Sequence, residues 1–141
     1  MKILIPVDGS DGAVRAVEHV IASCKLLKEA PQLFLLNVQW NIVAGNVKLF
    51  INQQTIDDYY REQGLAALAT AREKLSAAGM PYTYHISIGT PAEAIVQYAS
   101  EQQVDLVVLG ARGLNTLSNL LLGSVVDKVL RLAGQPVLVV R

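Results

Sequence analysis

Five short apolar runs are separated by longer stretches in which apolar residues recur at helical spacing. Aliphatic, β-branched and aromatic residues dominate the short runs, which predict strands at residues 2–7, 32–39, 82–88, 104–109 and 137–140. A helical pattern follows each of the first four runs. The order β-α-β-α-β-α-β-α-β predicts an α/β fold in which right-handed crossovers join a five-stranded, mostly parallel sheet with helices on both faces.

The first two helices are expected at about residues 10–24 and 56–78. Ser10 is placed to cap the first helix, and Gly79 to end the second. The side chains expected to face the core are Val14, Val17, Ile21 and Cys24 in the first helix and Leu65, Leu68 and Leu75 in the second. Residues 40–54, which precede the second helix, show no clear period.

The third helix has a start signal of its own. Thr90 is expected to cap it, Pro91 to occupy its first turn, and Glu93 to take the reciprocal capping-box position. We expect this helix to continue through Ala99, and a fourth helix at residues 125–132.

The composition favours one globular domain, residues 1–141, which buries roughly two-thirds of its unfolded surface. Hydrophobic residues make up 52% of the chain and charged residues 17%, which excludes intrinsic disorder. Twelve basic residues balance twelve acidic ones, so no net field favours nucleic acid or an anionic membrane. A small molecule or another protein is therefore the expected partner.

Several features point away from secretion, membrane insertion and metal binding. The N-terminus lacks a signal-peptide pattern, and no apolar run reaches the roughly 18 residues of a membrane span, so we expect a cytoplasmic protein. The lone Cys24 is expected to be an inert buried thiol. His19 and His85 have no third partner at metal-ligand spacing, which favours surface or packing roles.

Glycines punctuate the segment between the fourth strand and the fourth helix. The frame reads Gly110-Ala-Arg-Gly113, nine further residues, and then Gly123-Ser124. Glycines let the backbone approach an anion closely, and the free N–H groups and dipole of a helix N-terminus favour negative charge. The frame is neither a Walker A loop, since no lysine follows, nor the Gly-x-Gly-x-x-Gly dinucleotide fingerprint. Its position between a buried strand and a helix start still predicts a phosphate site.

A second loop, Asp8-Gly9-Ser10, follows the first strand. Ligands of parallel sheets bind beyond the carboxyl ends of the strands, where the strand order reverses. We therefore expect this loop and the glycine loop to border one crevice.

Taken together, these segments resemble the nucleotide-binding branch of the universal stress protein family. The matching stretches are residues 2–10, 35–38, 89–91 and 105–141, and the resemblance breaks down only around residues 40–55. The last stretch contains the runs Asp-Leu-Val-Val-Leu-Gly-Ala-Arg-Gly, Leu-Leu-Gly-Ser-Val and Pro-Val-Leu-Val-Val-Arg. The resemblance implies a Rossmann-like fold of the adenine nucleotide alpha hydrolase type, bound ATP or another adenine nucleotide, and a role in stress response.

The resemblance also implies which residues contact the nucleotide. Pro6, Val7 and Asp8 would line the adenosine, with Asp8 near the ribose hydroxyls, and Val38 would meet the adenine edge. The residues implied around the ribose and phosphates are Gly110, Gly113, Gly123, Ser124 and Val125. Apart from the resemblance, the positive charge of Arg112 makes this residue a further candidate for contact with the phosphates. Mg²⁺ would arrive on the nucleotide, because no carboxylate cluster suggests a site on the protein itself.

Simpler roles stay open for several of these residues. The loop that begins at Asp8 could be only a turn and a helix cap, and Val38 could belong to the core. Ser124 could cap its own helix, with Asp127 in a variant capping box. Arg112 could lie in solvent instead of neutralising phosphate.

Phosphoryl transfer needs charge neutralisation and a positioned nucleophile. The glycine loop has no P-loop lysine, and Asp8, the obvious carboxylate, is already assigned to the ribose. We therefore expect a regulatory nucleotide-binding protein with slow or negligible hydrolysis, no catalytic residue, and an unidentified protein partner. The alternatives are a nucleotide-independent interaction module of the same fold and a slow ATPase or nucleotidyl transferase.

Family members usually pair through the last strand, so the resemblance implies a homodimer. The residues concerned are Pro136, Val137, Leu138, Val139 and Val140. This segment is short, apolar and expected at a sheet edge, where unpaired backbone groups invite a partner.

Overall fold

The computed structural model describes residues 1–42, 50–114 and 122–141 of the chain. Its elements follow the predicted order: β1 (Lys2–Pro6), α1 (Asp11–Cys24), β2 (Gln32–Gln39), α2 (Gln53–Ala77), β3 (Tyr82–Ile88), α3 (Pro91–Glu101), β4 (Leu106–Gly110), α4 (Ser124–Leu132) and β5 (Val137–Val140). The described strands form one sheet in the order β3-β2-β1-β4-β5, and every pairing is parallel. The predicted α/β class is confirmed.

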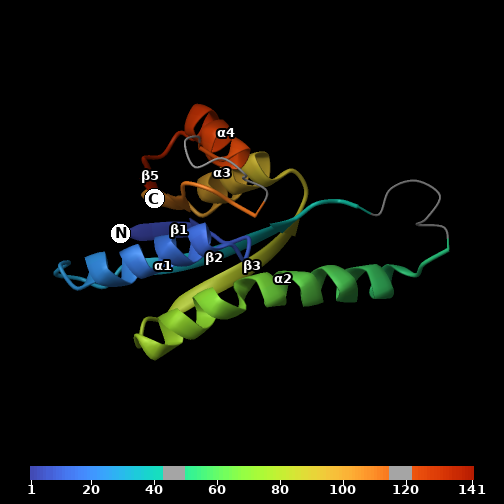
Figure 1. Cartoon of the computed structure of the whole chain (residues 1–141), viewed down its shortest axis with the longest axis horizontal. Coiled ribbons are helices and arrows are strands. Elements are labelled where there is room, and N and C mark those ends of the chain that lie inside the picture. The colour runs from blue at the N-terminus through green and yellow to red at the C-terminus, as the bar shows by residue number, and fades with distance from the viewer. Residues whose placement is uncertain (43–49, 115–121) are drawn as a thin grey trace.

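Helices cover both faces of the sheet (Figure 1), with α1 and α2 on one face and α3 and α4 on the other. Because successive side chains of a strand point to opposite faces, β1 contributes side chains to the apolar layers on both sides of the sheet. Ile3 and Ile5 pack with α1 and α2, whereas Leu4 packs with α3 and α4. Among the described residues, no helix is both long and apolar enough to cross a bilayer.

The buried face of α1 differs from the predicted stripe. Val17 is buried as expected, but Val14, Ile21 and Cys24 are only half-buried. The buried positions of this helix are Gly12, Ala13, Ala16, Val17 and Val20. The buried face begins with Gly12 and Ala13 because the first turn of α1 lies against the end of β4, where a Cβ on Gly12 would overlap the Arg112 carbonyl. A prediction based on hydrophobic spacing alone therefore placed the buried face of α1 wrongly, by a fraction of a helical turn.

Other expectations need smaller corrections. In α2, Leu68 and Leu75 are fully buried, but Leu65 is half-buried, and the helix begins at Gln53, three residues before the predicted start. β4 begins at Leu106, two residues after the predicted start. Val104 is buried, but its N–H bonds the Ala99 carbonyl at the end of α3 instead of joining the sheet. Part of the irregular stretch 40–54 and part of the glycine loop, residues 43–49 and 115–121, lie outside the described residues.

The strand order places β1 at the centre of the sheet. From β1 the chain goes to β2 on one side, and it later returns to form β4 on the other side. The connections after β1 and β4 therefore lead away from each other, and the space between them at the carboxyl ends of the strands is where a doubly wound sheet holds its ligand.

Candidate functional site

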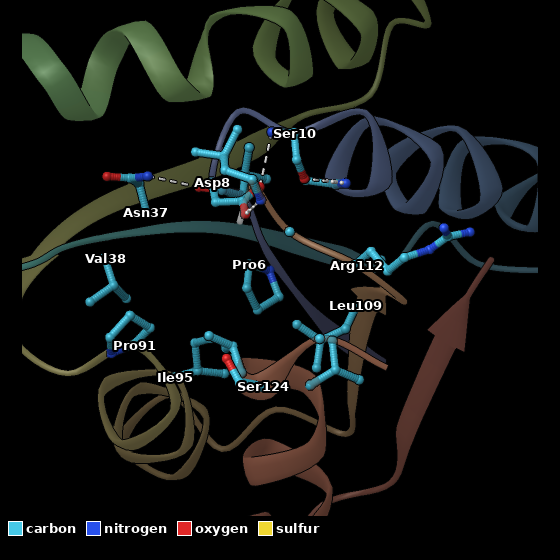
Figure 2. Close-up of a pocket in the computed structure, with 18 of the residues that line it drawn as sticks. Pro6, Asp8, Ser10, Asn37, Val38, Pro91, Ile95, Leu109, Arg112 and Ser124 are labelled. Carbon is cyan, nitrogen blue, oxygen red and sulfur yellow. Dashed lines mark hydrogen bonds between the residues drawn. The ribbon is translucent and has the colours of Figure 1, made fainter. Parts of the chain in front are cut away.

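A cavity of about 680 Å³ lies at the carboxyl ends of β1, β2 and β4 (Figure 2). This volume falls within the roughly 300–1,000 Å³ typical of small-molecule pockets. All ten residues predicted as nucleotide contacts line it: Pro6, Val7, Asp8, Val38, Gly110, Arg112, Gly113, Gly123, Ser124 and Val125. The two predicted loops thus border one crevice, as expected.

The cavity has apolar walls on the side of α3. Val38 and Pro91 lie together at one end, Ile95 follows along α3, and Leu109 lies at the end of β4 (Figure 2). Pro91 and Ile95 were predicted as parts of a helix but not as parts of a site. Their lining role depends on how α3 packs over the sheet, which no local pattern reveals.

Asp8 connects the loop after β1 to the glycine loop. Its Oδ1 accepts a hydrogen bond from the Ser10 N–H at 2.9 Å, and its Oδ2 accepts one from the Leu114 N–H at 3.2 Å. A Cβ built on Gly113 would lie only 2.6 Å from Asp8 Oδ2. Glycine at position 113 therefore lets the loop approach the carboxylate. Ser10 caps α1 as predicted, because its Oγ accepts from the Ala13 N–H at 3.2 Å.

Gly110 is required by packing as well as by the predicted site. A Cβ at Gly110 would overlap the backbone of Gly12 in the first turn of α1, and a Cβ at Gly12 would overlap the Arg112 carbonyl. The two glycines let α1 and the end of β4 come together. Gly12 was missed in the sequence, because its need for space depends on a strand about a hundred residues away.

The N-terminus of α4 opens into the cavity. Gly123 is the N-cap residue, no side chain caps the helix, and the Gly123 N–H bonds the Ala111 carbonyl at 2.9 Å. Ser124 is the first helical residue and does not cap the helix, so its structural alternative is wrong. Uncapped first-turn amides carry the positive end of the helix dipole. Thr90 does occupy the N-cap of α3, but its side chain makes no cap hydrogen bond.

Backbone groups of Val38 face the cavity because the β1–β2 ladder ends before them. In parallel strands, alternate residues direct both backbone groups to the same neighbour. The Val7 N–H bonds the Leu36 carbonyl at 2.7 Å, and the Gly89 N–H bonds the Gln39 carbonyl at 2.9 Å, so Val38 must face the β1 side. Pairing with β1 stops at Pro6 and Leu36, and within the described residues neither backbone group of Val38 has a partner.

One charge of each sign lines the described part of the cavity, Asp8 and Arg112. Beside it, the Lys128 ammonium donates a hydrogen bond to Glu93 and lowers the pKa of that carboxyl below its ordinary value. This pair links the first turn of α3 to α4.

Comparison with known proteins identifies the family. The model of the universal stress protein family matches residues 1–141. The chain belongs to the universal stress protein family.

Several relatives match this universal stress protein over nearly its whole length. Universal stress protein YxiE of Bacillus subtilis is 33% identical over 147 residues, covering 99% of this chain and 98% of its own. The solved structure of MJ0577, a universal stress protein of Methanocaldococcus jannaschii, has a TM-score of 0.81 at 30% identity and covers 99% of this chain and 94% of its own. A universal stress protein solved in complex with cAMP has a TM-score of 0.73 at 26% identity, covering 100% and 97%.

Other chemically active side chains of this universal stress protein lie away from the cavity. His19 contacts Ser23 Oγ on the surface of α1 at 3.3 Å, and the His85 ring stacks on Tyr98 at 5.4 Å, which confirms the surface and packing roles expected. Cys24 is half-buried, and burial raises the pKa of its thiol. Within the described ranges, no three His, Cys, Asp or Glu side chains gather where they could hold a metal.

Proposed function

We propose that this universal stress protein binds an adenine nucleotide, with ATP as the expected form, in the cavity at the ends of β1, β2 and β4. The nucleotide would set the protein's conformation or choice of partner in a stress response. One observation carries the proposal: residues from four separate segments, chosen from the sequence for nucleotide contact, line the same cavity.

The β2 end of the cavity fits an adenine base. Val38 offers a backbone donor and a backbone acceptor side by side. Adenine presents the matching pair on one edge, an acceptor at N1 and an amino donor at N6. Pro6, Pro91 and Ile95 supply apolar surface for the faces of the ring.

The opposite end fits a phosphate tail. The uncapped amides at the start of α4 favour an anion, and the Ser124 hydroxyl can donate beside them. Arg112 lines the cavity as well, but its side chain extends away from Ser124 in Figure 2, so contact with a phosphate would require its guanidinium to turn toward the cavity. The nucleotide would bring Mg²⁺ on its own phosphates. The cAMP complex of a 26% identical relative supports the same ligand class, an adenine ring joined to phosphate.

Hydrolysis would be slow. Asp8 is the carboxylate among the described lining residues, and two backbone amides already hold it. A base that must orient water for attack on the γ-phosphate needs lone pairs facing that water. We assign Asp8 to the ribose hydroxyls instead.

Nucleotide released from the purified protein tests the proposal. The protein is purified without added nucleotide and denatured, and the supernatant is analysed by mass spectrometry; ATP and adenosine binding to stripped protein are then measured by calorimetry. Release of an adenine nucleotide, binding of ATP at micromolar concentration, and negligible turnover with Mg²⁺ are expected. Protein that releases nothing and binds neither ligand would be an interaction module, and turnover far above background would make it an ATPase.

We further propose that the protein is a homodimer formed through β5. This strand is at the sheet edge. Hydrogen bonds from Val107 to the Pro136 carbonyl and from Ala111 to the Val140 carbonyl turn the even-numbered residues of β5 toward β4. The backbone groups of Val137 and Val139 therefore point to the open edge, where a second copy of β5 could pair with them.

A further inference from the structure

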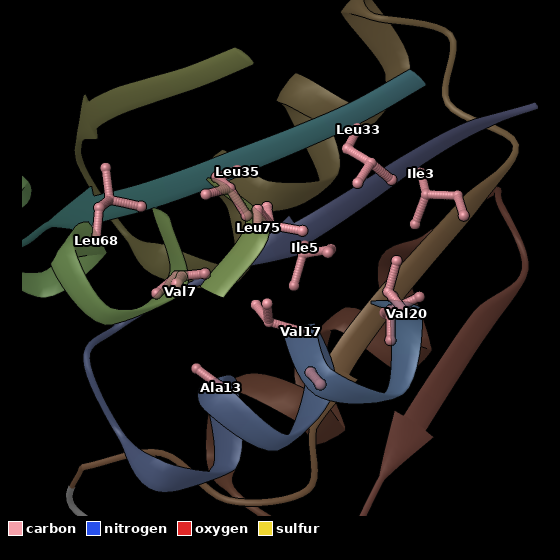
Figure 3. Close-up of a cluster of buried hydrophobic side chains, with 13 residues drawn as sticks. Ile3, Ile5, Val7, Ala13, Val17, Val20, Leu33, Leu35, Leu68 and Leu75 are labelled. Carbon is pink, nitrogen blue, oxygen red and sulfur yellow. The ribbon is translucent and has the colours of Figure 1, made fainter. Parts of the chain in front are cut away.

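Asn37 is a buried polar residue that the proposed function leaves without a role. It lies within β2 and lines the cavity, yet it is only 2% exposed. Leu33 and Leu35 precede it on the same face of the strand and point into the apolar layer beneath α1 and α2 (Figure 3). An amide in such a place costs stability unless its hydrogen bonds are satisfied, so its partners show what it does.

Both ends of the Asn37 amide have a partner. Its Nδ2 donates to the Val7 carbonyl at 2.8 Å, and its Oδ1 accepts from Gln39 Nε2 at 2.6 Å. A carbonyl can only accept, so the NH₂ group must face Val7. The Gln39 bond then holds the amide in this orientation. Figure 2 shows the Asn37 side chain directed toward the loop after β1.

The Val7 carbonyl is the next acceptor of the β1–β2 ladder. The last backbone bond of that ladder runs from the Val7 N–H to the Leu36 carbonyl. If the ladder continued by one rung, the Val7 carbonyl would accept the Val38 N–H. In the structure, the Asn37 side chain takes this acceptor instead, and the Val38 N–H stays available at the cavity wall.

We infer that Asn37 is a positioning residue that ends the β1–β2 ladder one rung early, so that the Val38 N–H and C=O select a 6-aminopurine over a 6-oxopurine base. The inference rests on the proposed function. A 6-aminopurine offers an acceptor at N1 and a donor at N6, which complement the Val38 pair. A 6-oxopurine carries a donor at N1 and an acceptor at O6. In the same position, its N1–H would face the Val38 N–H and its O6 would face the Val38 C=O, so neither hydrogen bond could form.

The test compares ATP with ITP, whose bases differ at these two positions, by calorimetry on the full-length protein. Wild-type protein is expected to bind ATP at least about tenfold more tightly than ITP. Asn37→Leu removes the side-chain donor to the Val7 carbonyl, so we expect this carbonyl to accept the Val38 N–H. ATP affinity should then fall about tenfold while ITP affinity changes by less than about threefold, so the preference collapses.

The control variant is Leu35→Val, which perturbs the neighbouring buried position on the same face of β2. It should lower stability but keep the wild-type preference for ATP. A folded Asn37→Leu protein that keeps the preference, or loses ATP and ITP affinity equally, overturns the inference. Wild-type protein that binds ATP and ITP equally also overturns it but leaves the proposed function intact. Wild-type protein that binds neither refutes the proposed function itself.

Amide hydrogen exchange tests the same point without ligand and without a variant. In the wild-type protein, the Val38 N–H should exchange at least about tenfold faster than the N–H groups of Asn37 and Gln39, which face β3. In Asn37→Leu, exchange at Val38 should slow toward that of its neighbours. A Val38 amide as protected as its neighbours in the ligand-free wild-type protein contradicts the inference, whether or not the variant folds.

Discussion

Substitution of Asp8 tests whether the ribose of the nucleotide lies beside this carboxylate. Its carboxylate already accepts the Ser10 and Leu114 N–H groups, at 2.9 and 3.2 Å. A carboxylate has about four lone-pair sites, so about two are left for the ribose hydroxyls. Hydrogen bonds to a charged group contribute about 1.5–3 kcal/mol each, and part of this is offset by lost solvation. We expect Asp8→Ala to weaken ATP binding by about 1–3 kcal/mol, or roughly 5- to 150-fold in Kd.

The same substitution also frees the glycine loop, because it removes the acceptor of the Leu114 N–H. A thermodynamic cycle separates the lost ribose contact from the freed loop. Each affinity is measured again with 2′,3′-dideoxy-ATP, which lacks both ribose hydroxyls. If Asp8 binds the ribose, Asp8→Ala weakens ATP but barely changes the dideoxy analogue. Equal weakening of both ligands would show that Asp8 acts through the loop alone and would refute the ribose contact.

Isothermal titration calorimetry at constant Mg²⁺ gives the four affinities, and circular dichroism with thermal melts confirms that each variant is folded. Asp11→Ala is the matched control. Asp11 is an exposed acidic residue three positions along the chain that does not line the cavity, so its removal changes net charge equally. A loss of ATP affinity in Asp11→Ala as large as that in Asp8→Ala would mean that long-range charge explains the effect.

Four further outcomes are expected. Leu68→Ala should lower the free energy of unfolding by about 2–5 kcal/mol in urea denaturation, because Leu68 is fully buried in the core. Gly110→Ala should cost about 1–3 kcal/mol in the same assay, since its Cβ would overlap the backbone of Gly12. Val139→Pro should give monomers in sedimentation experiments without unfolding, because the lost N–H points to the open edge of β5. Cys24 should react with iodoacetamide more slowly than a free cysteine and only at higher pH, because burial raises its pKa and keeps the thiolate scarce; reaction at the free rate contradicts this.

Strand positions could be predicted from the sequence wherever turn residues bound an apolar run. The predicted bounds of β2, β3 and β5 are confirmed, and Pro or Gly lies next to each of these runs. The predicted glycine loop also lies at the cavity, because a strand, a glycine and a helix start form a local pattern. Such features need no knowledge of distant contacts.

Features that depend on distant neighbours could not be predicted. Asn37 reads as an unexplained polar residue in an apolar strand until β1 is known to lie beside β2. From the sequence, Gly12 would only be expected to lower the stability of its helix. Its packing role appears once the end of β4 is known to lie against it. Ser124 fits the cap pattern, but the chain enters the helix one residue earlier, with Gly123 at the N-cap.

Most of the groups that we assign to the nucleotide belong to the backbone: the Val38 pair at the base and the first-turn amides of α4 at the phosphates. A backbone group is available with almost any side chain, provided that the chain can come close enough. The strict requirements therefore fall on positions where a Cβ would obstruct, such as Gly110 against α1 and Gly113 against Asp8.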